Sequence, residues 1–383
     1  MEIGRISLPK VKAVVVSCGM ITPYGWGIDA CWNGILSGKT AISRLNRFKT
    51  ETFQSDYAAT VDGLEYHQKD SLVMQMLKSL FHGTSVSIPQ DAKLILATTK
   101  GEIDFLERKI LKGTGDNSSC NLTSLLKKVS ALTGVQGEGM IISAACASSA
   151  AAVARAAAMI RSKNSDCVLV VACDSVTEFV FSGFSSLMAL DKFAARPFDK
   201  DRNGLSLGEA AAFALIMSES RAKDEKKQRL GEIAGWGLSD DANHMTGPSR
   251  DGDGVILAIK KALKAAGIGE SEVSFIAAHG TGTVYNDAME MKAFRAVFRD
   301  AKVPVYSIKG GIGHTMGATG LIEMIIALRA LKEKKIPPTV NLKEADEDAR
   351  GWVSPQERPV DNNKKVLITN AGFSGINTAL ILC

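Results

Sequence analysis

Three side chains of this sequence, Cys146, His279 and His314, together have the chemistry needed to move an acyl group. Cys146 stands between the apolar run Met140 to Ile142 and a series of small residues, Ala147 to Ala158. This order predicts a strand, a tight turn that carries the thiol, and then a helix. The positive end of a helix dipole favours thiolate over thiol, and a thiolate exchanges readily with thioesters. A cysteine among alanines is more often an inert packing residue, so the prediction depends on the histidines.

The two histidines both lie in glycine-rich segments. His279 begins the sequence His-Gly-Thr-Gly-Thr and follows the apolar run Val273 to Ala278, so it is expected where a strand ends. In parallel α/β sheets ligands bind at that edge. Thr281 and Thr283 present hydroxyls at alternate positions, which suits the amides of an extended ligand. His314 follows the glycine-rich stretch 305–313, whose glycines let the backbone approach a ligand closely.

An acidic residue and a lysine near His314 are expected to pair. Glu323 lies nine residues beyond His314, inside an apolar helical pattern, and a buried carboxylate needs a partner. Lys309 is the nearest cation in sequence. A purely structural ion pair and a direct catalytic role are equally open. For Asp287, one helical turn before Glu290, the default interpretation is a helix cap.

Phe373 stands between glycines in Gly372-Phe373-Ser374-Gly375, where a core phenylalanine would normally have β-branched neighbours. This pattern favours an aromatic side chain at the mouth of a pocket, with its backbone N–H available to a ligand.

The bulk composition excludes several classes of protein. The chain has 383 residues, enough for two domains or two fused halves, and its hydrophobic content of 45% is that of a globular protein. A net charge of +5 is too small and too dispersed for nucleic acid, but it suits an acidic protein partner. Seven scattered cysteines, without a C-x-x-C pair, indicate neither a disulfide framework nor a zinc site. Together with the absence of a signal peptide or a membrane span, this predicts a soluble, cytoplasmic protein without a metal.

Apolar runs alternate with helical patterns, which predicts an α/β fold. Strands are expected at 13–16, 94–97, 168–172, 212–217, 232–235, 275–278, 305–308, 366–369 and 378–382. Helices are expected at 30–37, 72–80, 124–132, 147–160, 254–266, 288–299 and 321–333. The order strand, small-residue turn, helix occurs around Cys146 and again around His314, so two similar halves are predicted, with the polar run 218–229 as their boundary.

Taken together, these motifs resemble the β-ketoacyl-acyl carrier protein synthases, in the branch of the thiolase superfamily that uses two histidines. Besides the segments above, the resemblance includes Trp32-Asn33-Gly34-Ile35, Arg196-Pro197-Phe198-Asp199, His244-Met245-Thr246 and Ile336-Pro337-Pro338-Thr339. It extends over nearly the whole chain, and the order and spacing of the cysteine and histidines are specific.

The resemblance implies a thiolase-like fold with a five-layer αβαβα core, divided into an N-terminal half at 1–225 and a C-terminal half at 226–383. It implies a decarboxylative Claisen condensation of an enzyme-bound acyl group with malonyl-acyl carrier protein, in fatty acid or polyketide and polyene synthesis. A homodimer is expected, with a heterodimer as the alternative. No cofactor is implied beyond the phosphopantetheine of the carrier protein.

The resemblance also implies a role for each site residue. Cys146 corresponds to the nucleophile, and His279 and His314 to the pair that promotes decarboxylation as neutral donors. Lys309 with Glu323 orients the site, and the N–H groups of Cys146 and Phe373 form the oxyanion hole. The phosphopantetheine or substrate contacts correspond to Thr281, Thr283 and Thr246, and the gate corresponds to Phe373.

Some features depart from the family pattern. Lys100 and Glu102 occupy a stretch that usually lines the acyl pocket, so either they point away or the pocket takes an unusual, polyene-like chain. Ser374 stands where glycine is usual, and the region 53–87 is short. Two alternatives remain: a non-catalytic partner subunit, which normally lacks the cysteine, and a thiolase or coenzyme A-dependent enzyme. Thiolases use a second cysteine, and the terminal Cys383 has no suitable loop around it.

Overall fold

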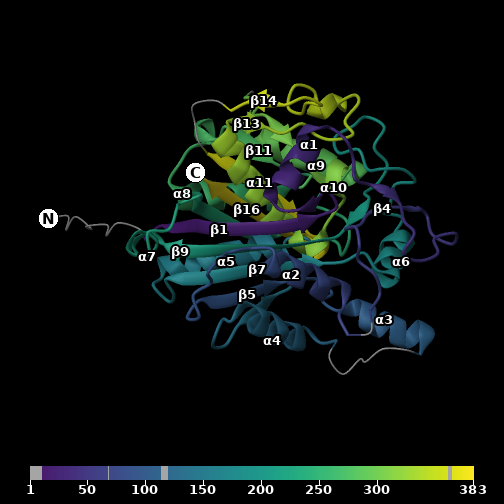
Figure 1. The fold of residues 1–383 in the computed structure, drawn as a ribbon. Coiled ribbons are helices and arrows are strands. Elements are labelled where there is room, and N and C mark those ends of the chain that lie inside the picture. The colour runs from purple at the N-terminus through teal and green to yellow at the C-terminus, as the bar shows by residue number, and fades with distance from the viewer. Residues whose placement is uncertain (1–10, 68, 114–119, 300, 361–364) are drawn as a thin grey trace.

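The computed structural model describes residues 11–67, 69–113, 120–299, 301–360 and 365–383, so the expectation about a leader at residues 1–10 lies outside them. In this part of the chain, five strands form a first sheet in the order β6, β5, β7, β9, β1 (Figure 1). Their bounds are β1 Ala13–Thr22, β5 Lys93–Ala97, β6 Met140–Ile142, β7 Cys167–Asp174 and β9 Ala210–Ser218. The first three strands in this order are parallel, and β9 and β1 are antiparallel to their neighbours.

A second set of five strands repeats the same pattern in the order β12, β11, β15, β16, β10. The bounds are β10 Gly231–Asp240, β11 Phe275–Ala277, β12 Val305–Tyr306, β15 Val366–Ala371 and β16 Ile376–Leu382. Again the first three are parallel and the last two are antiparallel to their neighbours. In chain order, β1, β5, β6, β7 and β9 correspond to β10, β11, β12, β15 and β16. The two similar halves expected from the sequence are therefore present.

Helices separate and cover the two sets of strands, which creates five layers (Figure 1). Between them lie α5 Ser148–Arg161 and α11 Thr319–Glu333, whose buried side chains form one hydrophobic cluster with inward residues of both sheets. On one outer face pack α2 Leu72–His82 and α4 Leu122–Thr133, and on the other α8 Asp253–Ala266 and α9 Val284–Phe298. The expected αβαβα core is confirmed. At the sheet corner, β1 and β10 join through only two residue pairs.

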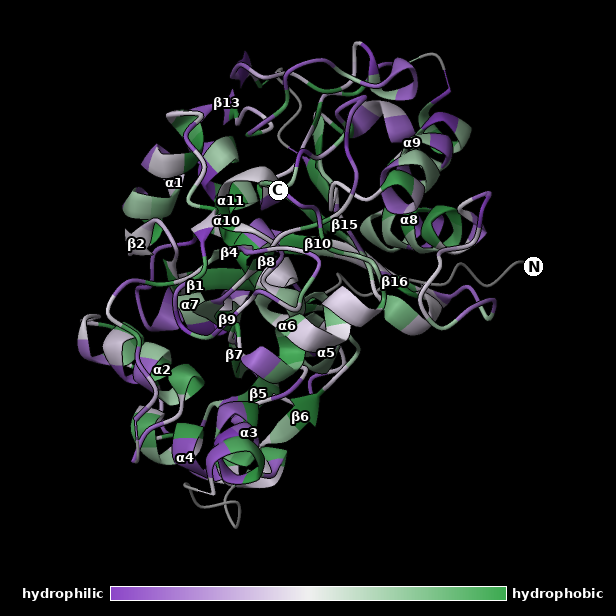
Figure 2. Cartoon of the chain, turned by 90° about the vertical axis from the view of Figure 1, so that its right-hand side faces the viewer, coloured by the Kyte–Doolittle hydropathy of each residue, from purple (hydrophilic) through white to green (hydrophobic). Residues whose placement is uncertain are grey.

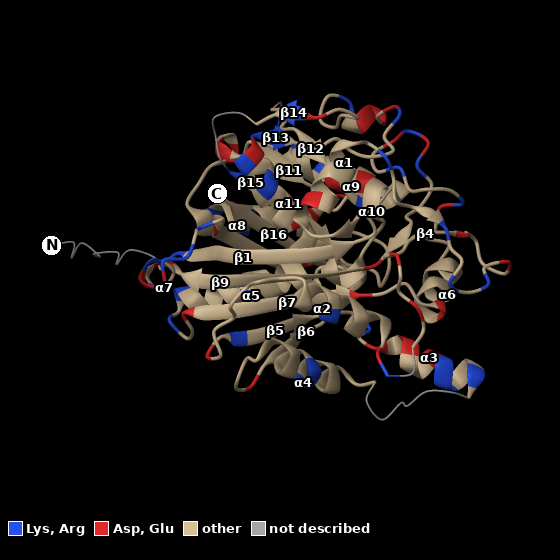
Figure 3. Ribbon diagram, viewed as in Figure 1, with Lys and Arg blue, Asp and Glu red and all other residues tan. Residues whose placement is uncertain are grey.

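Smaller elements complete the chain and surround the site. They are β2 Gly25–Trp26, α1 Ile28–Leu36, β3 Ser43–Arg44, β4 Tyr57–Ala59, α3 Ile103–Lys112, α6 Glu178–Ser186, β8 Leu207–Gly208, α7 Glu219–Asp224, η1 Glu270–Glu272, α10 Lys309–Ile312, η2 Met316–Ala318, β13 Lys335–Ile336, η3 Glu347–Ala349, β14 Arg358–Pro359 and η4 Phe373–Gly375. Figure 2 places the most hydrophilic residues in outer loops and helices, and Figure 3 shows central strands almost free of charged residues.

All the expected strands and helices are present, although several differ at their ends, and the helices α3, α6, α7 and α10 were not expected. None of the helices in the described part of the chain has the length and apolar character that crossing a bilayer requires.

Candidate active site

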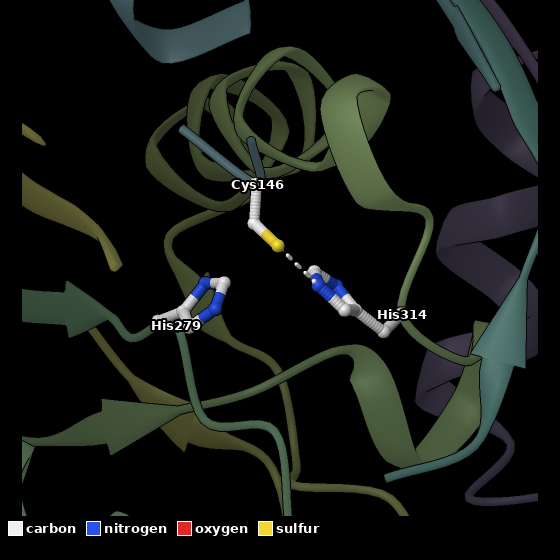
Figure 4. Close-up of side chains that lie close together, drawn as sticks. All are labelled: Cys146, His279 and His314. Atoms are coloured by element: carbon white, nitrogen blue, oxygen red, sulfur yellow. Dashed lines mark hydrogen bonds between the residues drawn. The ribbon is translucent and has the colours of Figure 1, made fainter. Parts of the chain in front are cut away.

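The nucleophile candidate lies in a tight turn between β6 and α5. Ala145, the residue before Cys146, has a φ of 46°, a left-handed conformation that is rare for a residue with a side chain. The Ser148 hydroxyl stabilises this turn, because its Oγ accepts from the Ala144 N–H at 2.9 Å and donates to the Ala145 carbonyl at 2.6 Å. The turn directs the thiol toward both histidines (Figure 4).

Cys146, His279 and His314 meet in one buried site, as the sequence predicted. The Nε2 atom of His314 lies 2.9 Å from the Cys146 Sγ, and the two imidazole rings are edge to face with centroids 5.3 Å apart. One ligand atom from each of the three residues lies within 4.8 Å of the others. All three side chains are buried, so a thioester carbon bound to the sulfur would lie within reach of both rings.

His279 is held in place by two carboxylates of α9. Glu290 accepts from the backbone N–H groups of His279 and Gly280 at 2.8 and 2.7 Å. Asp287 accepts from the N–H groups of Thr281 and Gly282. The prediction that Asp287 caps a helix is wrong: Thr283 is the N-cap of α9, and Asp287 lies inside its first turn. Sequence spacing alone did not reveal that both carboxylates hold the histidine loop.

The His314 backbone is fixed by the segment that contains β8. Its N–H donates to the Ser206 carbonyl at 2.7 Å, and its carbonyl accepts from the Gly208 N–H at 3.0 Å. Directly after it, Met316 in η2 has a φ of 51°, so the chain turns sharply before α11 begins. Both catalytic candidates, Cys146 and His314, therefore precede central helices on strained turns.

The predicted pairing of Lys309 with Glu323 is confirmed. The Lys309 Nζ lies 2.6 Å from Glu323 Oε1 and also donates to the His279 carbonyl. The second oxygen of Glu323 accepts from the Asn370 side-chain amide at 2.6 Å, a partner that the sequence did not reveal. Burial raises the pKa of Glu323 to about 7, while Lys309 acts in the opposite direction.

Burial and Lys309 keep both histidines neutral. The pKa values of His279 and His314 lie well below the ordinary value, first because the rings are buried and then because Lys309 is cationic. The pKa of the Cys146 thiol is raised to about 11 by burial, despite the lowering effects of Lys309 and the Phe373 N–H. The helix start was expected to favour a thiolate, and burial opposes that effect here as the largest influence on this pKa. The resting group is a thiol next to a neutral imidazole.

A cavity of about 170 Å³ leads to these three residues. Its lining includes Thr246, Thr281, Thr283 and Phe373, so every residue expected to contact a substrate lies there. The Phe373 ring stacks on Phe184 of α6 with centroids 5.6 Å apart. Its neighbour Gly372 packs so tightly that a Cβ atom would lie 3.2 Å from the Cys146 nitrogen. The segment with Phe373 is therefore directly against the nucleophile turn.

The unusual charges at 100–102 point away from this site. Lys100 is exposed to solvent. Glu102 is buried, but it pairs with Lys128 at 2.7 Å and accepts from the Ser71 hydroxyl at 2.8 Å. Neither charge lines the cavity that leads to Cys146, which favours the first of the two interpretations left open by the sequence.

The same cysteine and histidines could offer ligand atoms to a metal ion. The neighbouring Lys309 opposes that role, since its positive charge repels a metal cation. The absence of a metal stays a prediction, and thiol and imidazole chemistry accounts for the arrangement.

Comparison with known families gives two matches. A family model described as the N-terminal domain of beta-ketoacyl synthase matches residues 79–222, and one described as its C-terminal domain matches residues 230–343. Among curated proteins, 3-oxoacyl-[acyl-carrier-protein] synthase 2 of Vibrio cholerae is 28% identical, over 98% of this chain and 99% of the relative. A putative polyketide beta-ketoacyl synthase 1 of Streptomyces halstedii is 27% identical, over 97% of both chains.

Two solved structures are also similar to this chain over nearly its whole length. The ishigamide ketosynthase/chain length factor has a TM-score of 0.87 and 29% identity, covering 98% of this chain and 99% of the other. A beta-ketoacyl synthase from Burkholderia phymatum has a TM-score of 0.84 and covers 97% and 99% of the two chains, but at 24% identity it shows the fold alone.

Proposed function

Since the chain belongs to the β-ketoacyl synthase family, we propose that its cysteine and two histidines condense an acyl group with malonyl-acyl carrier protein. The protein is a condensing enzyme of the acyltransferase class, like its relatives named 3-oxoacyl-[acyl-carrier-protein] synthase. The observation that carries the residue roles is that Cys146, His279 and His314 are all buried, with one ligand atom from each within 4.8 Å of the others.

In the first step the acyl group moves to the enzyme. The Cys146 sulfur attacks the thioester carbonyl of an acyl carrier, and the thiol proton passes to the departing carrier thiol. The short contact to His314 supports this step, because an Nε2–H donor 2.9 Å from the Sγ stabilises the negative charge that the sulfur carries when its proton leaves. The backbone N–H groups of Cys146 and Phe373 act on the sulfur and would stabilise the tetrahedral oxyanion.

In the second step a malonyl carrier loses CO₂ and its C2 atom attacks the acyl carbonyl. The C–S bond to Cys146 breaks, the sulfur takes up a proton from water, and a 3-oxoacyl carrier leaves. Decarboxylation places negative charge on the malonyl thioester oxygen, and two neutral N–H donors stabilise it. His279 and His314 suit this role because burial and Lys309 hold their pKa values well below the ordinary value.

The substrates arrive on the phosphopantetheine of an acyl carrier protein, and no other cofactor is needed in this proposal. Thr246, Thr281 and Thr283 line the cavity and would contact the arm, while Phe373 would gate access to Cys146. We place the boundary between the two halves at residues 225 and 226, just before β10, and we expect the enzyme to act in the cytoplasm. Both fatty acid and polyketide or polyene synthesis suit the relatives' names.

The two alternatives have less support. A non-catalytic partner subunit would not need an assembled cysteine and two histidines. A thiolase would need a second cysteine at the site, but Cys383 lines a different hollow, together with Cys18. Among the described residues that line the catalytic cavity, Cys146 is the single cysteine.

Mass spectrometry of the intact protein tests the proposal. Incubation with acyl carrier substrates should add one acyl group to Cys146, and malonyl carrier protein should then discharge it as a 3-oxoacyl product. Cys146→Ala should abolish the adduct and the product but release some CO₂ from malonyl carrier protein, because the histidines remain. His314→Ala should form the adduct without product.

Cys18→Ala is the matched control, because Cys18 is half-buried and outside the site. It should behave as the wild type. Condensation by Cys146→Ala would refute the assignment of the nucleophile. Equal turnover of plain saturated acyl carriers with six to sixteen carbons, on the other hand, would argue against a specialised polyene chain.

A further inference from the structure

One buried carboxylate next to the site has no role in the steps above. Asp174 ends β7, is 1% exposed, and has no lysine, arginine or histidine within ion-pairing distance in the described part of the chain. An unpaired buried carboxylate is costly, so its retention there calls for a function. The raised pKa of Asp174, caused first by burial, reflects that cost.

The carboxylate instead accepts hydrogen bonds from neutral groups of two separate segments. From the loop after β5, Thr98 donates its hydroxyl at 2.8 Å, Thr99 donates its N–H and hydroxyl, and Lys100 donates its N–H at 3.2 Å. From the other side, Gly317 in η2 donates its N–H at 2.7 Å, the shortest of these bonds. Asp174 thus links the loop at 98–100 to the turn that follows His314.

The contact with η2 is too close for any side chain at position 317. A Cβ atom on Gly317 would lie 2.6 Å from Asp174 Oδ2 and 3.2 Å from Thr99. The preceding residue, Met316, has the strained φ of 51°, and a strained turn persists only where its surroundings hold it. His314 lies three residues before Gly317, so the bond to Asp174 fixes the end of the segment that carries the histidine.

We propose that Asp174 is a positioning residue of the condensation site, whose carboxylate clamps the η2 turn to the 98–100 loop and thereby holds His314 against Cys146. This inference rests on the proposed function but concerns a residue that touches neither substrate nor sulfur. A carboxylate suits the clamp better than an amide, because both of its oxygens accept. In an asparagine one of these positions would become a donor facing the N–H of Gly317 or Thr99.

The charge of Asp174 has a second, separately measurable consequence. Its negative charge raises the pKa of Cys146, against the lowering effect of Lys309. The other titratable groups around the thiol are His279 and His314, which are neutral, and Glu323, which is paired with Lys309. Loss of the Asp174 charge should therefore lower the pKa of the thiol, whereas a distorted turn that keeps the charge should not.

Two variants separate these effects. Asp174→Asn should reduce formation of 3-oxoacyl product roughly tenfold while Cys146 reacts faster with iodoacetamide at pH 8. If the pKa of the thiol falls by one unit, the thiolate fraction at pH 8 rises roughly tenfold. Because a thiolate of lower pKa is also a weaker nucleophile, the alkylation should become only roughly threefold faster. Gly317→Ala keeps the charge, so it should lose condensation to a similar degree with unchanged alkylation. Alkylation is followed on the peptide that contains Cys146, because six other cysteines are present.

Asp104→Asn is the matched control, since Asp104 is also fully buried and burial also raises its pKa, to about 6. It should change neither readout. The proposal is overturned if Asp174→Asn, folded by circular dichroism, leaves both rates within twofold of wild type, or if Asp104→Asn reproduces its effects. Should Asp174→Asn fail to fold, Gly317→Ala decides: normal condensation overturns the clamp. Failure of the wild type to condense would refute the proposed function, while the alkylation rates would still test Asp174.

Discussion

At the scale of single residues, Lys309 controls the charge state of the site. Its ammonium group is buried, pairs with Glu323 and lowers the pKa values of His279, His314 and Cys146 together. A cation in the protein interior acts strongly because little solvent screens it. Burial and then Lys309 keep the imidazoles neutral, and Lys309 also makes the thiol easier to ionise. The proposed reaction needs both conditions at the same pH.

The pH dependence of malonyl decarboxylation should report this effect. A histidine with a lowered pKa stays neutral down to that value, so the acidic limit of the wild type should lie well below pH 6.5. Lys309→Met removes the cation, which should raise both histidine pKa values and move the acidic limit upward by roughly one pH unit. Without Lys309 the pKa of Glu323, now about 7, would rise, so this carboxyl group would be protonated over the acidic part of the range. The measurement is CO₂ release from malonyl carrier protein between pH 4.5 and 8.

The exposed Lys334, at the end of α11, provides the control. Lys334→Met should leave the acidic limit in place. An unchanged limit in Lys309→Met would mean that burial alone keeps the imidazoles neutral.

At the scale of elements, α9 supports the site through its buried carboxylates. Asp287 accepts from the N–H groups of Phe198, Thr281 and Gly282. Phe198 itself has a left-handed φ of 60°. Asp287 thus joins the helix to two separate loops, one at Phe198 and one at 281–282.

Asp287→Ala should lower the free energy of unfolding by about 3 kcal/mol, because it leaves three buried N–H groups without an acceptor. Urea denaturation followed by circular dichroism measures the difference. Asp253→Ala, in the first turn of α8 and exposed, should cost about 0.5 kcal/mol through the helix dipole alone. Equal losses in the two variants would show that the contacts of Asp287 add nothing to an ordinary helix start.

The same carboxylates mark what the sequence could and could not predict. The strands, the central helices and the cysteine with its two histidines followed from apolar runs and glycine-rich turns, since these are local signals. Helix α3 was missed because its buried face carries Asp104, Glu107 and Arg108, which hide the apolar period. Asp174 was missed for a related reason: its partners lie near residue 99 and at residue 317. The one available indication of its role was the position of a carboxylate at the end of a strand that is buried along its whole length.

At the scale of the whole molecule, the two sheets differ at their corresponding outer strands. On β12 the outer edge is covered, because the Val305 N–H donates to the Trp352 carbonyl at 2.8 Å. On β6, within the described residues, hydrogen bonds to other strands are made with β5 alone. Its residues Met140 to Ile142 are only half-buried despite being apolar. An open, apolar strand edge invites pairing with another chain.

We therefore expect the chain to dimerise by joining β6 to a second copy, or to a synthase-like partner when one is present. Light scattering after size exclusion should give the purified chain twice its mass of 40.8 kDa. Met140→Lys should shift the mass to that of a single chain, because a lysine at a strand edge opposes pairing. Leu257→Lys, the same kind of change on the exposed side of α8, should remain a dimer. If the Met140→Lys variant is still a dimer and its circular dichroism spectrum is native, the dimer interface does not include the edge of β6.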